Sequence, residues 1–187
     1  SVGGSDWQEL HIRDVDSGQD LDEVLHYLKF SSIAWHPDSK GFFYNRFPDP
    51  ETVEEEDRNR YNRVYFHQLG TSQEQDLLVY EDPSDPDLGF SPWIPDGGEY
   101  VILYVYRGTD PKNRIYLRRL DDEGPFTELL DREDALYNPL GIVDGSLIVH
   151  TDADAPRGRI VAMDLEDPSR DQWREIVGQR QEVIDHA

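Results

Sequence analysis

Short apolar and aromatic runs alternate with turn-forming residues along the whole chain. Residues 31–44, SSIAWHPDSKGFFY, and residues 90–103, FSPWIPDGGEYVIL, each place Pro-Asp and glycine between two such runs. Proline fixes φ where a turn begins, aspartate hydrogen-bonds its own backbone two residues on, and glycine accepts a positive φ. Each segment therefore predicts a strand, a tight turn and a second strand, and residues 138–150, NPLGIVDGSLIVH, are a weaker third copy.

A second pattern follows each hairpin. It reads NRVYFHQL, NRIYLRRL and GRIVAMDL, with arginine in equivalent places at Arg63, Arg114 and Arg159. Another short apolar run comes next, within DLLVYED, FTELLDR and QWREIVG. Four short strands in about 45 to 58 residues are typical of a β-propeller blade. One hairpin match would fit ordinary turn usage in any all-β protein, but three copies of two patterns in the same order favour an array.

The repeats predict an all-β chain with about three full four-stranded blades and partial blades at its ends. The predicted segments are the end of one blade at 1–30, full blades at 31–82, 88–132 and 137–178, and the start of a further blade at 179–187. The acidic stretch ETVEEEDRNR at 51–60 lengthens the first interval. We interpret it as a solvated loop rather than a calcium site, because alternating Asp and Asn ligands around a central glycine are missing.

The charge balance restricts the partners that this chain can bind. It has 187 residues, with 18 basic against 40 acidic side chains and a formal net charge of −22. Such a surface repels phosphate backbones and anionic lipids, so we expect neither a nucleic-acid nor a membrane partner. No run approaches the roughly 20 apolar residues of a spanning helix, which predicts a soluble chain. Zero cysteines fit a cytoplasmic location, with the periplasm as the alternative.

The sequence offers little catalytic chemistry. A nucleophile elbow needs Gly-x-Ser-x-Gly between a strand and a helix, and the nearest approach, GFSPW, has Trp93 in place of the last glycine. Ser91 also falls inside a repeated strand, which favours a structural role. The six histidines lack the spacing of a zinc site, so most are interpreted as surface or strand-face residues. We therefore expect no catalytic residue, no metal and no cofactor.

Longer stretches are more specific. The segments GSDWQELHIRDVDSGQDLDEVLHYLKFSSIAWHPDSKGFFYNRFP, VYFHQLGTSQEQDLLVYEDP and RGTDPKNRIYLRRL resemble the prolyl oligopeptidase family, serine peptidases that cut short peptides after proline. The resemblance runs from about Gly4 to Val177 and lies within the family's N-terminal seven-bladed propeller. It implies that the chain is an excerpt of that ring, and that an α/β-hydrolase domain carrying Ser, Asp and His lies outside it.

The resemblance also carries over three positions that face the substrate cavity or the domain interface: Asp6 in GSDW, Phe30 in KFSS and Thr109 in RGTDP. Phe30 is expected to flank an apolar substrate residue, with packing between blades as the alternative. Asp6 is expected to supply a charge near the interface and Thr109 a cavity contact, unless both are turn residues. Tyr106 stands where some members carry an arginine that pairs with this aspartate, so Asp6 needs another partner.

The resemblance implies the substrate-gating, non-catalytic propeller portion of a serine-type prolyl endopeptidase, with related serine peptidases of other specificity still open. A stand-alone propeller that binds proteins or peptides without catalysis is the alternative. The expected partners are the α/β-hydrolase domain and short proline-containing peptides. Because an incomplete ring leaves its terminal blades uncovered, we also expect self-association through bare strand residues such as Leu10, Ile12, Ile160 and Val161.

Overall fold

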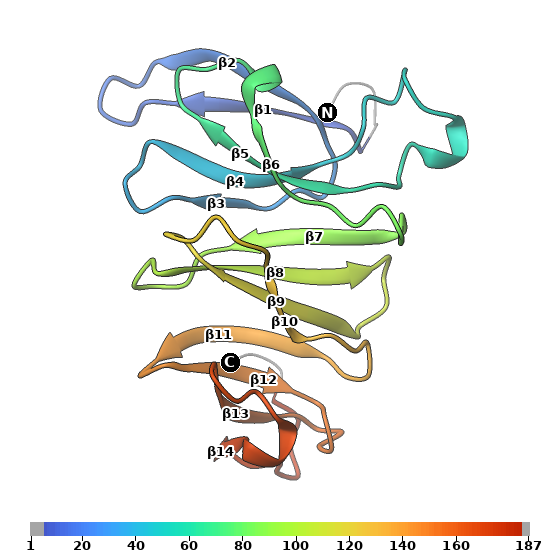
Figure 1. The fold of residues 1–187 in the computed structure, drawn as a ribbon, viewed down its shortest axis with the longest axis vertical. Helices are drawn as coiled ribbons and strands as arrows, with labels where there is room; N and C mark the ends of the chain where they lie inside the picture. Colours follow the sequence, from blue (N-terminus) through green and yellow to red (C-terminus); the bar gives the residue numbers. More distant parts are fainter. Residues whose placement is uncertain (1–5, 185–187) are drawn as a thin grey trace. The chain divides into compact units, whose positions relative to one another are not determined.

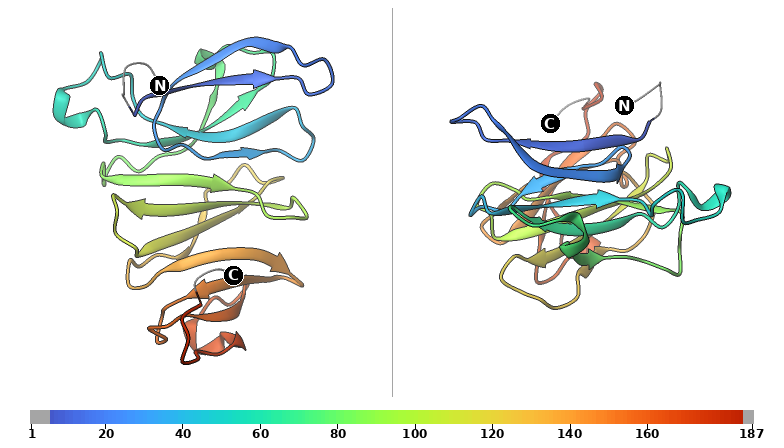
Figure 2. Two further views of the ribbon diagram at one scale, coloured as in Figure 1. Left: turned by 180° about the vertical axis from the view of Figure 1, so that it is seen from behind. Right: turned by 90° about the horizontal axis from the view of Figure 1, so that it is seen from above.

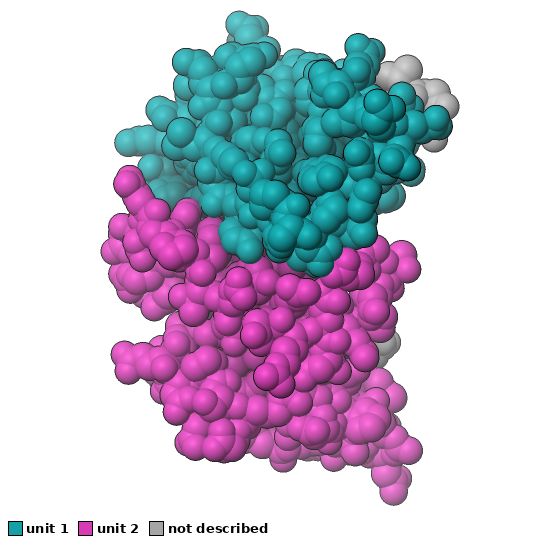
Figure 3. Space-filling view, turned by 45° about the vertical axis from the view of Figure 1, so that its right-hand side comes forward, with its two compact units in different colours: residues 1–93 teal, residues 94–187 magenta. Residues whose placement is uncertain are grey.

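The computed structural model describes residues 6–184 and consists of short antiparallel strands joined by turns (Figure 1). Its helical content within these residues is limited to three 3₁₀ turns, η1 (Glu55–Asp57), η2 (Gln73–Gln75) and η3 (Arg170–Gln172). The chain forms two compact units, residues 1–93 and 94–187, which are coloured separately in Figure 3. The all-β prediction is confirmed.

Between residues 6 and 93, the first unit contains seven strands. A two-stranded sheet pairs β1 (Gln8–Arg13) with β2 (Asp20–Leu28). A four-stranded antiparallel sheet follows in chain order, with β3 (Ile33–Trp35), β4 (Gly41–Arg46), β5 (Arg63–Gln68) and β6 (Leu77–Tyr80). The next strand, β7 (Leu88–Trp93), contacts β3, β4 and β5. Figure 2 shows the β3–β6 meander from two further sides.

The second unit contains the other seven strands. Neighbouring antiparallel strands are β8 (Tyr100–Arg107), β9 (Asn113–Arg119) and β10 (Thr127–Leu130). A four-stranded sheet then runs through β11 (Tyr137–Val143), β12 (Ser146–Thr151), β13 (Arg159–Asp164) and β14 (Arg174–Val177). These meanders have the strand order that the repeats predict.

The predicted hairpins form for the reasons of turn chemistry given above. Between β11 and β12, Asp144 and Gly145 have φ of 48° and 74°, as a two-residue type I′ turn requires, and Val143 pairs with Ser146 across it. Between β3 and β4, Gly41 lies so close to β5 that a Cβ atom would be 2.4 Å from the His67 carbonyl oxygen. Only glycine fits there, which fixes the start of β4.

The repeated arginine of the second pattern occupies the same place in each meander. It stands at or next to the start of the third strand, and its guanidinium pairs with a glutamate that lies in the fourth strand or shortly after it. The three pairs are Arg63–Glu81 at 2.9 Å, Arg114–Glu133 at 2.9 Å and Arg159–Glu175 at 3.9 Å. The sequence repeat is therefore a structural repeat.

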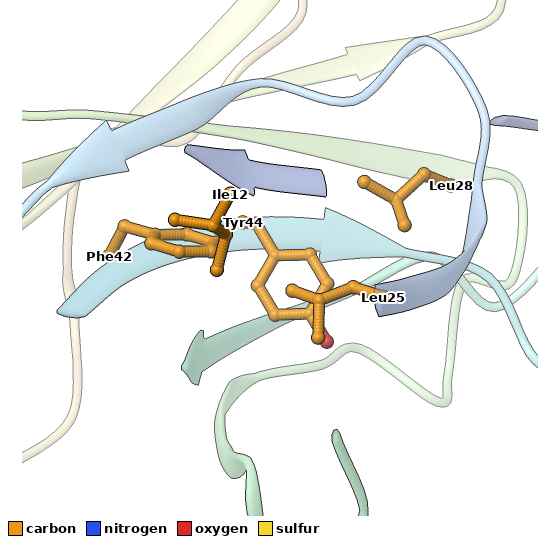
Figure 4. Packing of buried hydrophobic residues seen from close by; sticks show 5 residues of the cluster. All are labelled: Ile12, Leu25, Leu28, Phe42 and Tyr44. Carbon is orange, nitrogen blue, oxygen red and sulfur yellow. The ribbon is translucent and has the colours of Figure 1, made fainter. Parts of the chain in front are cut away.

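A cluster of buried residues joins the two sheets of the first unit: Ile12, Leu25, Leu28, Phe42 and Tyr44 (Figure 4). It corrects one prediction, because Ile12 is only 6% exposed, covered by β2 and β4. Val161 was also expected to be bare, but it is 1% exposed, since β13 lies between β12 and β14 and Val161 pairs with buried Val149. Leu10 and Ile160 are half-buried.

Candidate functional site

Strand pairing brings two of the three predicted site residues together. Asp6 immediately precedes Trp7 and β1, while Phe30 lies two residues after the end of β2. The register pairs Gln8 with Leu28, so the segment that enters β1 and the segment that leaves β2 are neighbours at the same end of the sheet. Asp6 and Phe30, which are 24 positions apart in the sequence, therefore lie on the same surface.

Lys29 is the centre of this surface. Its ammonium nitrogen lies 3.5 Å from Asp6 Oδ2 and donates a hydrogen bond of 3.0 Å to Asn59 Oδ1. It also lies 5.7 Å from the ring centroid of Trp7 and 5.8 Å from that of Phe30, within the range of cation–π attraction. The side chain of Lys29 is only 17% exposed. We call Asp6, Trp7, Lys29, Phe30 and Asn59 the Lys29 cluster.

The cluster provides the partner that Asp6 needed. Its carboxylate pairs with Lys29 within the same unit, while the carboxylate itself stays 61% exposed. An exposed carboxylate can still accept further hydrogen bonds from an approaching group. The ion pair itself contributes little to stability, because solvent screens a pair with one exposed member.

Phe30 presents its ring to solvent. It is 71% exposed, and its φ of 50° lies in the left-handed region, which side chains other than Asn, Asp and Gly adopt uncommonly. A left-handed backbone at a residue other than glycine costs free energy, and such strained residues are concentrated at functional sites. The arrangement can hold an apolar group against the ring, with the ammonium of Lys29 and the carboxylate of Asp6 nearby.

The connection between β4 and β5, which contains the acidic insertion at 51–60, supports the cluster from one side. Phe47 packs edge-on against Trp7 at 6.1 Å between ring centroids, and its backbone N–H donates to the Tyr27 carbonyl. The Tyr27 hydroxyl donates to Asp49 at 2.9 Å, and this hydrogen bond raises the pKa of Tyr27. The insertion, which carries η1 at the right of Figure 1, is thus attached to β2 at its base, while Glu54 to Glu56 are exposed as a solvated loop.

Thr109 lies in the second unit and is not part of the cluster. It is exposed in the turn that follows β8, where the Asp110 N–H donates to the Arg107 carbonyl at 3.1 Å. Tyr106, at the end of β8, is half-buried, and burial raises its pKa. Its ring centroid is 6.4 Å from that of Tyr104. Thr109 is therefore a turn residue by conformation, and its role as a cavity contact stays a prediction.

A buried polar network in the β3–β6 sheet was missed by sequence reasoning. His67 Nδ1 lies 2.7 Å from Asp76 Oδ1, both side chains are 0% exposed, and the Tyr44 hydroxyl donates to Asp76 Oδ2 at 2.5 Å. Gln73 donates to the Tyr44 oxygen and to the His26 carbonyl. A His–Asp pair can be catalytic, but no substrate reaches a fully enclosed one, so this network is structural.

The structure shows the surroundings of the candidate nucleophile Ser91 and the distribution of possible metal ligands in the described part of the chain. Ser91 lies within the extended strand β7, as its repeat position predicted, rather than on a turn into a helix. Residues 6–184 contain no cluster of His, Asp and Glu that could hold a metal ion. None of the helical turns in this range is long or apolar enough to cross a membrane.

Comparison with known proteins places the chain in a family. The model of the prolyl oligopeptidase N-terminal beta-propeller domain matches residues 1–186. Prolyl oligopeptidase A of Amanita bisporigera is 35% identical, over 90% of this chain and 25% of that protein. Prolyl endopeptidase of Elizabethkingia meningoseptica is 30% identical, over 99% of this chain and 26% of that protein.

Solved structures agree with the sequence relatives. A structure from a study of two prolyl endopeptidases superposes with a TM-score of 0.84 at 28% identity, covering 96% of this chain and 25% of that one. Prolyl oligopeptidase B from Galerina marginata, bound to a 25mer macrocyclization substrate, gives a TM-score of 0.85 at 26% identity, over 95% and 27% of the two chains. This chain spans about a quarter of the length of these proteins. It belongs to the prolyl oligopeptidase family and covers part of the family's N-terminal β-propeller domain.

Proposed function

We propose that this chain is the substrate-gating, non-catalytic propeller portion of a serine-type prolyl endopeptidase that cleaves short peptides after proline. The observation that carries the proposal is the match of the propeller-domain model to residues 1–186. Relatives at 30% to 35% identity are named prolyl endopeptidase and prolyl oligopeptidase, which supports the same activity for the whole protein. A related serine peptidase with a different specificity is the nearest alternative.

The work is divided between two domains in this proposal. The serine nucleophile, its histidine base and the orienting aspartate belong to an α/β-hydrolase domain, which is the main partner of this chain. The propeller contributes binding and exclusion: its ring admits short proline-containing peptides and keeps folded proteins out. The exposed ring of Phe30 contacts an apolar substrate residue, with Asp6 and Lys29 beside it.

The remaining partners follow from charge and exposure. A net charge of −22 disfavours nucleic acid and anionic membranes. A cytoplasmic or periplasmic location is part of the proposal. Self-association through exposed strand residues is also part of the proposal: Ile12 and Val161 are buried, but Leu10 and Ile160 are half-buried, and Leu77 and Ile176 are 66% and 46% exposed.

The test uses the full-length protein that contains this chain, beside the chain alone. The full-length protein is expected to hydrolyse a chromogenic glycyl-proline anilide and to lose this activity with a serine-directed fluorophosphonate. It should also cleave a proline-containing octapeptide but not the same sequence within a folded protein. The chain alone should be inactive. Peptide binding by the full-length protein without turnover would instead show a stand-alone binding propeller.

A further inference from the structure

An asparagine stands before the repeated arginine in two of the three repeats. Asn62 precedes Arg63 and Asn113 precedes Arg114, whereas Gly158 precedes Arg159. Both asparagines are enclosed, with exposed fractions of 2% and 0%. A buried amide costs free energy unless its polar atoms find hydrogen-bond partners. The partners of these two amides show what they do.

Asn113 binds the backbone of the strand that opens the next repeat. Its Oδ1 accepts a hydrogen bond from the Tyr137 N–H at 2.7 Å, and its Nδ2 donates to the Tyr137 carbonyl at 2.9 Å. Tyr137 is the first residue of β11 and is 1% exposed. One side chain therefore satisfies both backbone groups of a buried residue, as a neighbouring strand would.

Asn62 makes the corresponding contact one repeat earlier, with one bond fewer. Its Oδ1 accepts from the Phe90 N–H in β7 at 3.1 Å and from Asn45 Nδ2 at 3.4 Å. Its own Nδ2 is buried with no hydrogen-bond partner among the described residues. The link to the following strand is thus a single backbone bond.

The third repeat cannot make this contact. Gly158 has no side chain, its φ is +82°, and a Cβ atom there would lie 2.5 Å from His150 Nε2. His150 itself is 9% exposed and occupies the space that an amide would need. In this repeat Arg157 makes the contacts to the following residues: its N–H donates to Gln179 Oε1, its guanidinium donates to the Gln181 carbonyl, and its carbonyl accepts from the Ile184 N–H at 3.1 Å.

We propose that the asparagine before the repeated arginine clamps its repeat to the strand that opens the next, and that the Asn113 junction is held more firmly than the Asn62 junction. The number of buried clamp bonds to the next strand falls from two at Asn113 to one at Asn62, and Gly158 has no side chain to form one. A junction held by fewer buried hydrogen bonds opens more readily by local unfolding. The inference concerns the propeller alone and does not depend on the proposed activity.

Hydrogen–deuterium exchange on the full-length protein tests the clamp. Asn113→Ala should speed exchange of the amides in β11 by about tenfold or more, because both bonds to Tyr137 are lost. Asn113→Leu keeps the branched shape of the side chain without leaving a cavity and should do the same, which separates loss of the hydrogen bonds from loss of packing. Asn138→Ala removes an exposed amide one residue further along β11 and should change nothing. Wild-type exchange in β11 of the Asn113→Leu protein would overturn the clamp.

The order of opening is a second measurement on the same samples. In the unmodified protein, exchange should be slower in β11 than in β7, because two buried clamp bonds hold the start of β11 and one holds β7. Equal protection of β7 and β11 would show that the second bond adds nothing, and the proposed order would be wrong.

Discussion

Tyr44→Phe removes one hydroxyl group from the buried network and leaves the aromatic ring in place. That hydroxyl donates to Asp76 Oδ2 at 2.5 Å and accepts from Gln73 at 3.2 Å. A hydrogen bond to a charged group contributes about 1.5 to 3 kcal/mol, and a buried carboxylate oxygen left without this donor adds to the loss. Because the side chain of Asp76 is 0% exposed, water cannot replace the donor. We therefore expect a loss of about 2 to 3 kcal/mol in the stability of the β3–β6 sheet.

Native-state hydrogen exchange of the full-length protein measures this loss locally. A change of 2 to 3 kcal/mol should accelerate exchange of the slowest β4 and β5 amides by about 30- to 140-fold. The matched control is Tyr65→Phe, since Tyr65 lies directly across from Tyr44 in the register but is half-buried. This control should stay within about 0.5 kcal/mol of the unmodified protein. If the two variants exchange alike, the Tyr44–Asp76 bond does not stabilise the sheet and our reasoning is refuted.

Three further outcomes are expected. Phe30→Ala in the full-length enzyme should raise KM more than it lowers kcat, because an aromatic ring in the cavity wall binds ground and transition states alike. The control Val15→Ala, at a 93% exposed position, should alter neither constant, and an unchanged KM for Phe30→Ala would assign Phe30 a different role. Gly41→Ala should lower the free energy of unfolding, measured with denaturant, by about 1 to 3 kcal/mol, since its Cβ would meet the His67 carbonyl. Gly141→Ala, with open space around it, should be neutral, and equal denaturation midpoints for the two variants would contradict this. Burial raises the pKa of Tyr44, so the folded state favours the neutral phenol, and the stability this contributes is fully present below about pH 10 and falls as the pH rises further. Unfolding midpoints measured across that pH range should therefore fall less for Tyr44→Phe than for the unmodified protein.

Much of the fold could be predicted because its signals are local. Asp144 and Gly145 determine a turn through their own backbone preferences, and the flanking apolar runs have only one way to pair across it. The repeated arginine could also be recognised from the sequence, since each copy stands at a fixed place in the strand that carries it. Ile12 was misjudged because alternation along a strand shows which face is apolar, but not that β4, about 30 residues later, covers that face.

The candidate site was only partly accessible from sequence for the same reason. Asp6 and Phe30 were named through the family resemblance, but their link through Lys29 depends on the β1–β2 register, which contains two irregularities that no pattern announces. Asn59 reaches the cluster from an insertion whose path is set by tertiary contacts. His67 looked like any other strand residue, because its partner Asp76 lies across a turn that sequence spacing does not define.

The asparagine clamps also affect how the polypeptide is completed during synthesis. Asn113 finds its partner 24 residues later and Asn62 finds its partner 28 residues later, so neither amide can be satisfied when its own four-stranded meander has just left the ribosome. We therefore expect the two meanders that carry these asparagines to become fully stable only when the first strand of the next one has emerged. A truncated chain that stops at the end of a fourth strand leaves a buried amide without its partner, whereas a cut placed after the following strand keeps it. Fragments of this domain should therefore be divided one strand beyond the boundary that the repeats suggest.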